Sequence, residues 1–160
     1  MSDPRPGIRP EIGQTAPDFT LPDAAGTPTN LAALCKRGAV VLYFYPKDET
    51  AGCTVEACAF RDAYEDFAGA GAQVVGVSRD DQASHQRFAS GHRLPFVLLS
   101  DPKGTVHDLY GVGKRLFLIP DRVTFVIDRD RVVRHTFSSM VNMRAHITEA
   151  LAVVRRLSNP

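Results

Sequence analysis

Two cysteines five residues apart, Cys53 and Cys58, are the side chains whose type and spacing most directly indicate chemistry in this sequence. Cys53 follows the loop 46–52 and begins a predicted helix. A thiol in the first turn of a helix experiences the partial positive charge of unpaired amide groups, which increases the fraction of nucleophilic thiolate. Thr50 adds a hydroxyl that can reach the sulfur or a molecule bound beside it. We therefore predict that Cys53 is a reactive thiol rather than a small buried hydrophobic residue.

The spacing of Cys53 and Cys58 can be tested against helix geometry. Five residues correspond to a rise of about 7.5 Å and a rotation of about 140°, which places the two Cα atoms roughly 8–9 Å apart. Because disulfides require Cα atoms within about 7 Å of each other, the two cysteines cannot pair while the helix is intact. If they do pair, the first turns must unwind, and disulfide formation is coupled to local unfolding. The alternative is that Cys58 is a cysteine of the helix core.

Other candidate sites have weaker support. The histidines are scattered and none is near Cys53 in sequence, which disfavours a zinc site, and the absence of Cys-x2-Cys disfavours an ordinary dithiol exchanger. Glu56 and Arg61 are about one helical turn apart and either orient the loop or form a solvated surface pair of little energetic weight. Cys35 lies near the end of a short predicted helix, where we expect a packed apolar thiol.

A strand and a helix must position Cys53. Residues 39–45 are continuously β-branched, aromatic or otherwise apolar, which is typical of a central strand buried on both faces. Phe60, Tyr64 and Phe67 occur at helical spacing and predict a helix over 53–70 that shares its buried face with Cys53. The loop between these elements lies at the carboxyl end of the strand, where open α/β sheets place their sites.

The remaining elements complete a helix-flanked α/β sheet with an antiparallel edge. We expect Asn30, Asp80 and Asn142 to cap helices. Turn residues at 128–131 separate the last two strands and predict an antiparallel hairpin. The further predicted strands are 18–21, 73–77, 96–99, 123–127 and 132–137, and the further predicted helices are 31–35, 81–90, 105–110 and 143–157.

The composition excludes several classes of protein. Nineteen Lys and Arg against eighteen Asp and Glu give a formal net charge of +1 without any charge block, which argues against a nucleic-acid binder with a basic field. The longest apolar run is far shorter than the ~20 residues that span a membrane. The polar, proline-rich start lacks the apolar stretch of a secretory signal, so we expect a cytoplasmic protein. A length of 160 residues predicts one domain over 13–160, preceded by a flexible arm over 1–12.

The segment around Cys53 closely resembles the active-site segment of peroxiredoxins. The resemblance is strongest to the subgroup called bacterioferritin comigratory protein or peroxiredoxin Q, and it runs over Tyr43–Asp62. The family's Pro-x3-Thr-x2-Cys signature falls on Pro46, Thr50 and Cys53. A partner cysteine five residues on, here Cys58, is a feature of many members of that subgroup.

Two further segments extend the resemblance. Asp121–Asp128 resembles the segment that carries the family's active-site arginine, which would be Arg122. Gly13–Phe19 resembles the family's N-terminal opening. Ala51 departs from the family, which often has proline there; this removes no chemical group from the loop.

The resemblance implies a thioredoxin-like α/β fold of the peroxiredoxin type, with a central mixed sheet flanked by helices and additional N-terminal strands. It implies a thiol-dependent peroxidase that reduces hydrogen peroxide and organic hydroperoxides to water and alcohols, without a metal or cofactor. Cys53 would become a sulfenic acid, Cys58 would resolve it as an intramolecular disulfide, and thioredoxin or a similar dithiol would reduce that bridge. Arg122 would stabilise the departing oxygen, Thr50 and the Cys53 N–H would hold the peroxide, and Pro46 would shield the sulfur from water.

A different class of protein would use the same dithiol without turnover. A non-catalytic redox sensor or a chaperone-like binding domain also needs a reactive thiol with a partner, so the sequence separates these poorly from an enzyme. A structural interaction module would instead contain an unreactive Cys53. For the peroxidase that the resemblance implies, we expect a monomer, or at most a weak dimer, with no nucleic-acid or membrane partner.

Overall fold

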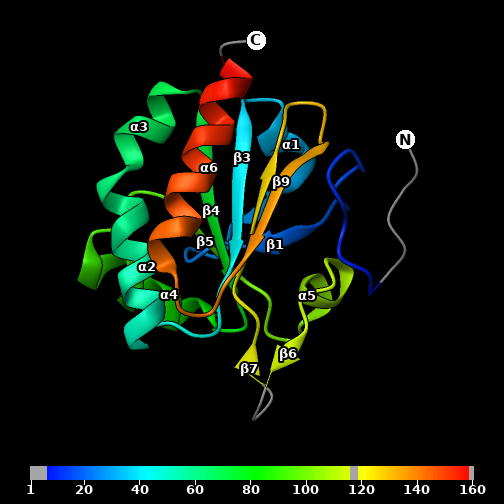
Figure 1. The fold of residues 1–160 in the computed structure, drawn as a ribbon. Helices are drawn as coiled ribbons and strands as arrows, with labels where there is room; N and C mark the ends of the chain where they lie inside the picture. The colour runs from blue at the N-terminus through cyan, green and yellow to red at the C-terminus, as the bar shows by residue number, and fades with distance from the viewer. Residues whose placement is uncertain (1–6, 116–118, 159–160) are drawn as a thin grey trace.

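The computed structural model describes residues 7–115 and 119–158, and at its centre is a five-stranded mixed sheet of order β5-β4-β3-β8-β9 (Figure 1). β3 pairs in parallel with β4, and β4 with β5, whereas β3 pairs with β8 and β8 with β9 in antiparallel fashion. The strands are β3 (Ala39–Phe44), β4 (Ala72–Ser78), β5 (Val97–Ser100), β8 (Val123–Ile127) and β9 (Val133–Ser138). The predicted mixed sheet and its antiparallel hairpin are thereby confirmed.

Two small antiparallel pairs flank this sheet. β1 (Thr20–Pro22) pairs with β2 (Pro28–Asn30), which supplies the additional N-terminal strands that the resemblance implies. β6 (Lys114–Arg115) pairs with β7 (Ile119–Pro120) below the end of the main sheet where β8 begins (Figure 1).

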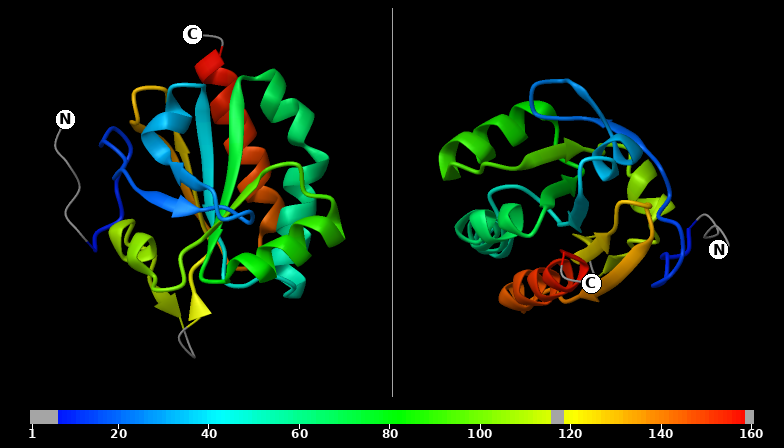
Figure 2. Two further views of the ribbon diagram at one scale, coloured as in Figure 1. Left: turned by 180° about the vertical axis from the view of Figure 1, so that it is seen from behind. Right: turned by 90° about the horizontal axis from the view of Figure 1, so that it is seen from above.

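Helices cover both faces of the sheet (Figure 2). α2, α3, α4 and α6 contribute side chains to the core on one face, and α1 and α5 to the core on the other. The helices are α1 (Leu31–Cys35), α2 (Ala51–Asp62), α3 (Tyr64–Gly69), α4 (Gln82–His92), α5 (Thr105–Leu109) and α6 (Met143–Ser158). No helix of the described residues is long and apolar enough to cross a membrane.

The alternation along β3 explains why there are two cores. Val41 and Tyr43 point into the core under α2, α3, α4 and α6, whereas Val40, Leu42 and Phe44 point into the core under α1 and α5. Successive side chains of a strand point to opposite faces, so a strand in the middle of the sheet must be apolar throughout. The buried central strand predicted over 39–45 is confirmed, although β3 ends at Phe44.

Two of the three predicted helix caps are confirmed, and one is wrong. The Asn30 side chain accepts from Ala33 N–H, and the Asn142 side chain accepts from Ala145 N–H. α4 is capped by Asp81, whose side chain accepts from Ser84 N–H at 2.8 Å, and not by Asp80. Asp80 is engaged elsewhere, because its carboxylate accepts from the backbone N–H of Asp48 in the loop 46–52.

The single helix predicted over 53–70 is two helices. α2 ends at Asp62, Ala63 adopts φ −93° and ψ 4°, and α3 begins at Tyr64. Phe60 and Phe67 are both fully buried on the same side of the break. The aromatic spacing therefore continues across the break, and hydrophobic periodicity could not reveal it.

The N-terminal segment contacts the domain where it is described. Arg9 Nη2 donates to Gly111 O at 3.4 Å, and Pro10 is buried. The first half of the predicted arm, residues 1–6, lies outside the described residues. The division into an arm over 1–12 and a domain over 13–160 stays a prediction.

Candidate active site

Cys53 lies in the first turn of α2, after the loop that leaves the carboxyl end of β3. α2 begins at Ala51, two residues earlier than predicted, so Thr50 is the N-cap residue and Cys53 is the third residue of the helix. Thr54 N–H donates the first intrahelical hydrogen bond, to Thr50 O at 2.9 Å. The amides before it, including that of Cys53, have no partner within the helix and direct positive partial charge toward the sulfur.

The Cys53 side chain is buried. It is 1% exposed and belongs to the core cluster that contains Tyr43, Phe60 and Phe67, so the predicted shared face is confirmed. Because such a site is shielded from water, nearby charges and dipoles act on the sulfur more strongly than they would at the surface.

Arg122 is the positive charge that the described contacts place beside this sulfur. The antiparallel pairing of Phe44 with Val123 brings the residue before β8 beside the loop that follows β3. Arg122 is 3% exposed, and its guanidinium lies against Gly52. A Cβ atom added to Gly52 would be 3.0 Å from Arg122 Nη2. Burial lowers the pKa of Arg122, but the charges of Glu56 and Cys53 and hydrogen bonding to both outweigh burial, and the pKa is raised.

Glu56 is the site residue whose partner the sequence analysis did not identify. Its side chain is fully buried, and its Oε1 accepts from Arg122 Nη1 at 2.6 Å. The expected pairing of Glu56 with Arg61 is wrong, because Arg61 donates to His92 O and pairs with Asp62. Glu56 lies three residues after Cys53, and residues three apart on a helix are neighbours on its surface. This spacing is the sequence signal that could have placed Glu56 at the site.

The charge state of Glu56 is governed by its burial. Burial raises the pKa of Glu56 to about 7, against the opposing effect of Arg122. Its Oε2 is buried without a hydrogen-bond donor among the described residues and faces His146 Nδ1 at 3.6 Å. A carboxyl group with one unsatisfied oxygen is costly to ionise, which agrees with the raised pKa.

His146 is neutral in this arrangement. Its Nε2 donates to Ser139 O at 2.8 Å, and its Nδ1 lies 2.7 Å from Thr124 Oγ1, which can donate to it. Burial, with a smaller contribution from the Arg122 charge, lowers the pKa of His146 to about 4. The 3.6 Å approach to Glu56 is therefore not an ion pair, and Arg122 is the cation that faces Glu56.

Thr50 and Pro46 lie in the loop before α2. The Thr50 hydroxyl donates to Lys47 O at 2.8 Å, which leaves its lone pairs free to accept from another group. Thr50 is exposed and Pro46 is half-buried. The structure thus places both residues of the predicted signature in the loop that leads to Cys53, and their roles stay predictions.

The three cysteines are free and occupy different environments. Cys58 is half-buried in the same continuous helix as Cys53, so helix geometry keeps their Cα atoms roughly 8–9 Å apart. Cys35 is 1% exposed in the core on the opposite face of the sheet, and burial raises its pKa to about 11. Cys35 is therefore the packed apolar thiol that the sequence predicts, and the sheet separates it from Cys53.

The surface beside Cys53 is a cleft between the first turns of α2 and α6. It has a volume of about 450 Å³, and apolar side chains including Val55, Val141 and Met143 contribute to its lining. Val55 is 56% exposed and Val141 is 85% exposed. Gly52, the residue before the cysteine, lines the same cleft, so the cleft reaches the first turn of α2.

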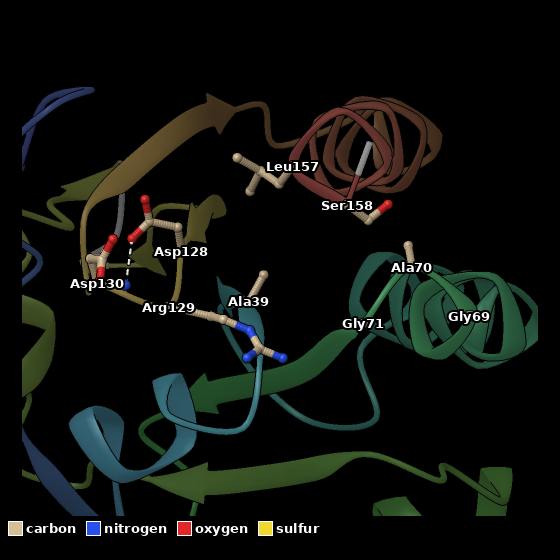
Figure 3. Close-up of a pocket in the computed structure, with 9 residues that line it drawn as sticks. All are labelled: Ala39, Gly69, Ala70, Gly71, Asp128, Arg129, Asp130, Leu157 and Ser158. Atoms are coloured by element: carbon tan, nitrogen blue, oxygen red, sulfur yellow. Dashed lines mark hydrogen bonds between the residues drawn. The ribbon is translucent and has the colours of Figure 1, made fainter. Parts of the chain in front are cut away.

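A second pocket, of about 500 Å³, contains none of the cysteines (Figure 3). It lies at the opposite end of β3, between the last turns of α3 and α6 and the β8–β9 turn, where Arg129 extends toward Ala39 (Figure 3). Among the described residues, no group of three or more His, Cys, Asp or Glu side chains could hold a metal ion. The convergence of Cys53, Arg122 and Glu56 therefore defines the candidate active site.

Comparison with known proteins identifies the family. The model of the AhpC/TSA family matches residues 12–136. Peroxiredoxin Q of the Arabidopsis thaliana chloroplast is 49% identical over 144 residues, which cover 89% of this chain and 66% of the relative. The Triticum aestivum protein of the same name is 47% identical over 91% of this chain and 67% of its own length. The chain belongs to the AhpC/TSA family of peroxiredoxins.

Solved peroxiredoxin structures place it within that family. The crystal structure of peroxidoxin BcpB from Mycobacterium tuberculosis has a TM-score of 0.88 at 44% identity, covering 93% of this chain and 99% of that one. A Xanthomonas campestris peroxiredoxin Q structure has a TM-score of 0.81 at 32% identity, covering 88% and 91%. The peroxiredoxin fold and the peroxiredoxin Q subgroup expected from the Cys53 segment are thereby confirmed, and with them an enzyme of the thiol peroxidase type. This chain spans about two thirds of the length of the plant relatives.

Proposed function

We propose that this peroxiredoxin reduces hydrogen peroxide and organic hydroperoxides through Cys53, with Cys58 as the resolving cysteine and thioredoxin or a similar dithiol as the reductant. The observation that carries the proposal is the burial of Cys53 at the start of α2, with the Arg122 guanidinium against the same helical turn. The Xanthomonas campestris bacterioferritin comigratory protein, which is 31% identical to this chain, is described as having alkyl peroxide reduction activity, and this supports the same substrate class here.

In the first step, the Cys53 thiolate attacks the terminal oxygen of the hydroperoxide. A sulfur–oxygen bond forms, the oxygen–oxygen bond breaks, and the departing alkoxide or hydroxide takes up a proton to become an alcohol or water. Arg122 stabilises the negative charge that moves from sulfur to the departing oxygen, from a position fixed by its bond to Glu56. Thr50 and the free N–H of Cys53 hold the peroxide for near-linear attack, and Pro46 limits the access of water to the sulfur.

In the second step, the Cys58 thiol condenses with the Cys53 sulfenic acid and releases water. An intact α2 keeps the two Cα atoms beyond disulfide distance, so the first turns of the helix must unwind. Cys35 is a poor alternative, because it is buried in the core on the other face of the sheet. The external dithiol then reduces the bridge to two thiols and is itself oxidised to a disulfide.

The cellular setting of this cycle is part of the proposal. We infer a cytoplasmic protein that acts as a monomer, or at most a weak dimer, without a nucleic-acid or membrane partner. The relatives named above from plants are described as chloroplastic, which is a statement about those proteins.

Peroxide consumption coupled to a thioredoxin system tests the proposed function. Cys53→Ser should abolish turnover, because no other group in the first turn of α2 or in the loop before it can supply a thiolate. Cys35→Ser is the matched control, since it removes a buried thiol on the opposite face of the sheet and should retain turnover. Appreciable hydrogen peroxide turnover by Cys53→Ser would refute the proposal.

A further inference from the structure

A buried polar network connects the active-site loop to α4 and β5, and the steps described above do not use it. Asp48 lies in the loop between Pro46 and Thr50 and is 3% exposed. Its Oδ1 accepts from the Tyr45 hydroxyl, and its Oδ2 accepts from Ser84 Oγ at 2.9 Å and from His85 Nδ1 at 2.7 Å. The carboxylate is therefore held by groups from the end of β3 and from α4.

His85 must carry a positive charge in this network. Its Nδ1 faces Asp48 Oδ2, and its Nε2 faces Leu99 O at 2.9 Å. The ionised Asp48 carboxylate and the Leu99 carbonyl group only accept hydrogen bonds, so both ring nitrogens must donate, which requires the imidazolium form. The His85 and Asp48 side chains are 0% and 1% exposed, so the two charges form an ion pair shielded from solvent.

The other groups that face His85 favour the same charge state. Tyr45 Oη lies 3.5 Å from Nδ1 and donates its hydrogen bond to Asp48, and the Asp80 carboxylate adds a second negative charge. Burial lowers the pKa of His85, but the hydrogen bond and charge of Asp48 outweigh it, with help from Leu99 O and Asp80, so the pKa is raised.

The peptide group between Lys47 and Asp48 links this network to Thr50. Its N–H, on Asp48, donates to Asp80 Oδ2 at 2.8 Å, and its C=O, on Lys47, accepts from the Thr50 hydroxyl at 2.8 Å. Because a peptide unit is planar and rigid, a rotation that frees one of these groups also moves the other. The orientation of the Thr50 hydroxyl therefore depends on how firmly Asp48 is held.

We propose that the Asp48–His85 ion pair positions the active-site loop for the peroxide reaction, by fixing the peptide group that orients the Thr50 hydroxyl beside Cys53. Asp48 and His85 are positioning residues, since they act through Thr50 and touch neither substrate nor sulfur. The inference rests on the proposed function of Cys53 and Thr50. It predicts that loss of the pair slows attack on peroxide while the intrinsic reactivity of the thiol is retained.

The fold supplies a matched control in a second buried Asp–His pair. His107 Nδ1 lies 2.7 Å from Asp101 Oδ2, with the side chains 1% and 3% exposed. Asp101 also accepts from the amides of Val106 and His107, so it holds the start of α5, which packs on the other face of the sheet. His107 Nε2 has no hydrogen-bond partner among the described residues, so this pair lacks the second anchor that Leu99 provides to His85.

The test compares two reactions of Cys53 in the full chain. Rapid mixing with hydrogen peroxide measures oxidation, which needs an oriented substrate, and iodoacetamide measures alkylation, which needs only an accessible thiolate. Both reactions require the thiolate, so the fraction of ionised Cys53 divides out of the ratio of the two rate constants. Asp48→Asn and His85→Gln should each lower the ratio between ten- and a hundredfold, the loss typical of a misplaced reacting group. Asp101→Asn should keep the wild-type ratio.

Two further readouts separate positioning from stability. In the wild type the ratio should fall as the pH rises and His85 loses its proton, whereas in His85→Gln it should be low and independent of pH. The double variant D48N/H85Q leaves no buried charge unpaired and should recover part of the ratio lost in the single variants. Should neither single variant fold, Ser84→Ala removes one donor to Asp48 and is expected to lower the ratio about threefold; an unchanged ratio there would overturn the proposal.

The remaining outcomes distinguish the two levels of the account. Folded Asp48→Asn and His85→Gln proteins with the wild-type ratio at every pH would overturn the positioning role alone. An equal fall of the ratio in Asp101→Asn would also overturn it, since loss of any buried Asp–His pair would then have the same effect. A wild-type protein whose Cys53 is alkylated but never oxidised by peroxide would overturn the proposed function, and the positioning role with it.

Discussion

Replacing Glu56 with glutamine tests the electrostatics of the site most specifically. Glu56 is fully buried, bonds Arg122 through one oxygen and has no donor for the other among the described residues. Glu56→Gln keeps the shape of the side chain and an oxygen that can accept from Arg122, but it removes the titration. The variant should therefore change how the free energy of unfolding depends on pH.

The expected magnitude follows from the pKa of Glu56, which burial raises from its usual 4.5 to about 7. At about 1.4 kcal/mol per pH unit, this difference corresponds to about 3 kcal/mol. The folded state binds the proton more tightly than the unfolded state, so this stability is fully present below pH 4.5 and is lost as the pH rises through 7. Between pH 5.5 and 8.5 the loss amounts to about 2 kcal/mol.

Urea unfolding of the reduced protein at pH 5.5, 7 and 8.5 measures this loss. His146, whose pKa is lowered to about 4, changes stability in the opposite direction, but it is present in both proteins and cancels in the comparison. The wild type should lose about 2 kcal/mol more than Glu56→Gln over this range. Glu65→Gln, at an exposed position, should follow the wild type. Parallel curves for the wild type and Glu56→Gln would refute the reasoning.

Three further variants probe the site by stopped-flow oxidation with hydrogen peroxide. Thr50→Val removes only a hydroxyl and should lower the second-order rate constant at least about tenfold; an unchanged constant would remove Thr50 from the site. Arg122→Met should slow oxidation about a hundredfold or more, because a fixed positive charge beside the departing oxygen is lost, and a wild-type rate would exclude that role. Gly52→Ala adds a Cβ 2.7 Å from Met143 Cε and 3.0 Å from Arg122 Nη2. Methionine can move, but Arg122 is held by its bond to Glu56, so a several-fold loss of rate is expected and full activity would contradict it.

Much of the fold could be predicted because it depends on local patterns. The apolar run 39–45 is typical of a strand buried on both faces, and the alternation in β3 bears this out. The caps at Asn30 and Asn142 follow from side chains that bond amides three residues on. The break at Ala63 could not be predicted, because Phe60 and Phe67 remain on one buried face across it.

Less of the candidate site could be predicted from the sequence, because its charged residues are brought together by strand pairing and tertiary contacts. Glu56 was expected to pair within its helix, but the β3–β8 register places a buried arginine against it. Arg122 itself was found through the family resemblance, and no local spacing connects it to Cys53. The Asp48–His85 pair joins residues 37 positions apart, so only the folded chain reveals it.

Peptide mapping of the peroxide-treated protein tests the central claim most directly. One equivalent of hydrogen peroxide, alkylation of remaining thiols and non-reducing mass spectrometry identify which sulfurs are joined, and amide exchange follows α2 in the same sample. The account predicts a Cys53–Cys58 bridge, with faster exchange from Cys53 to Phe60 that reverses with a dithiol. A Cys53–Cys35 bridge would contradict the assignment of the resolving cysteine, and undiminished protection of that segment in the bridged protein would contradict the unwinding.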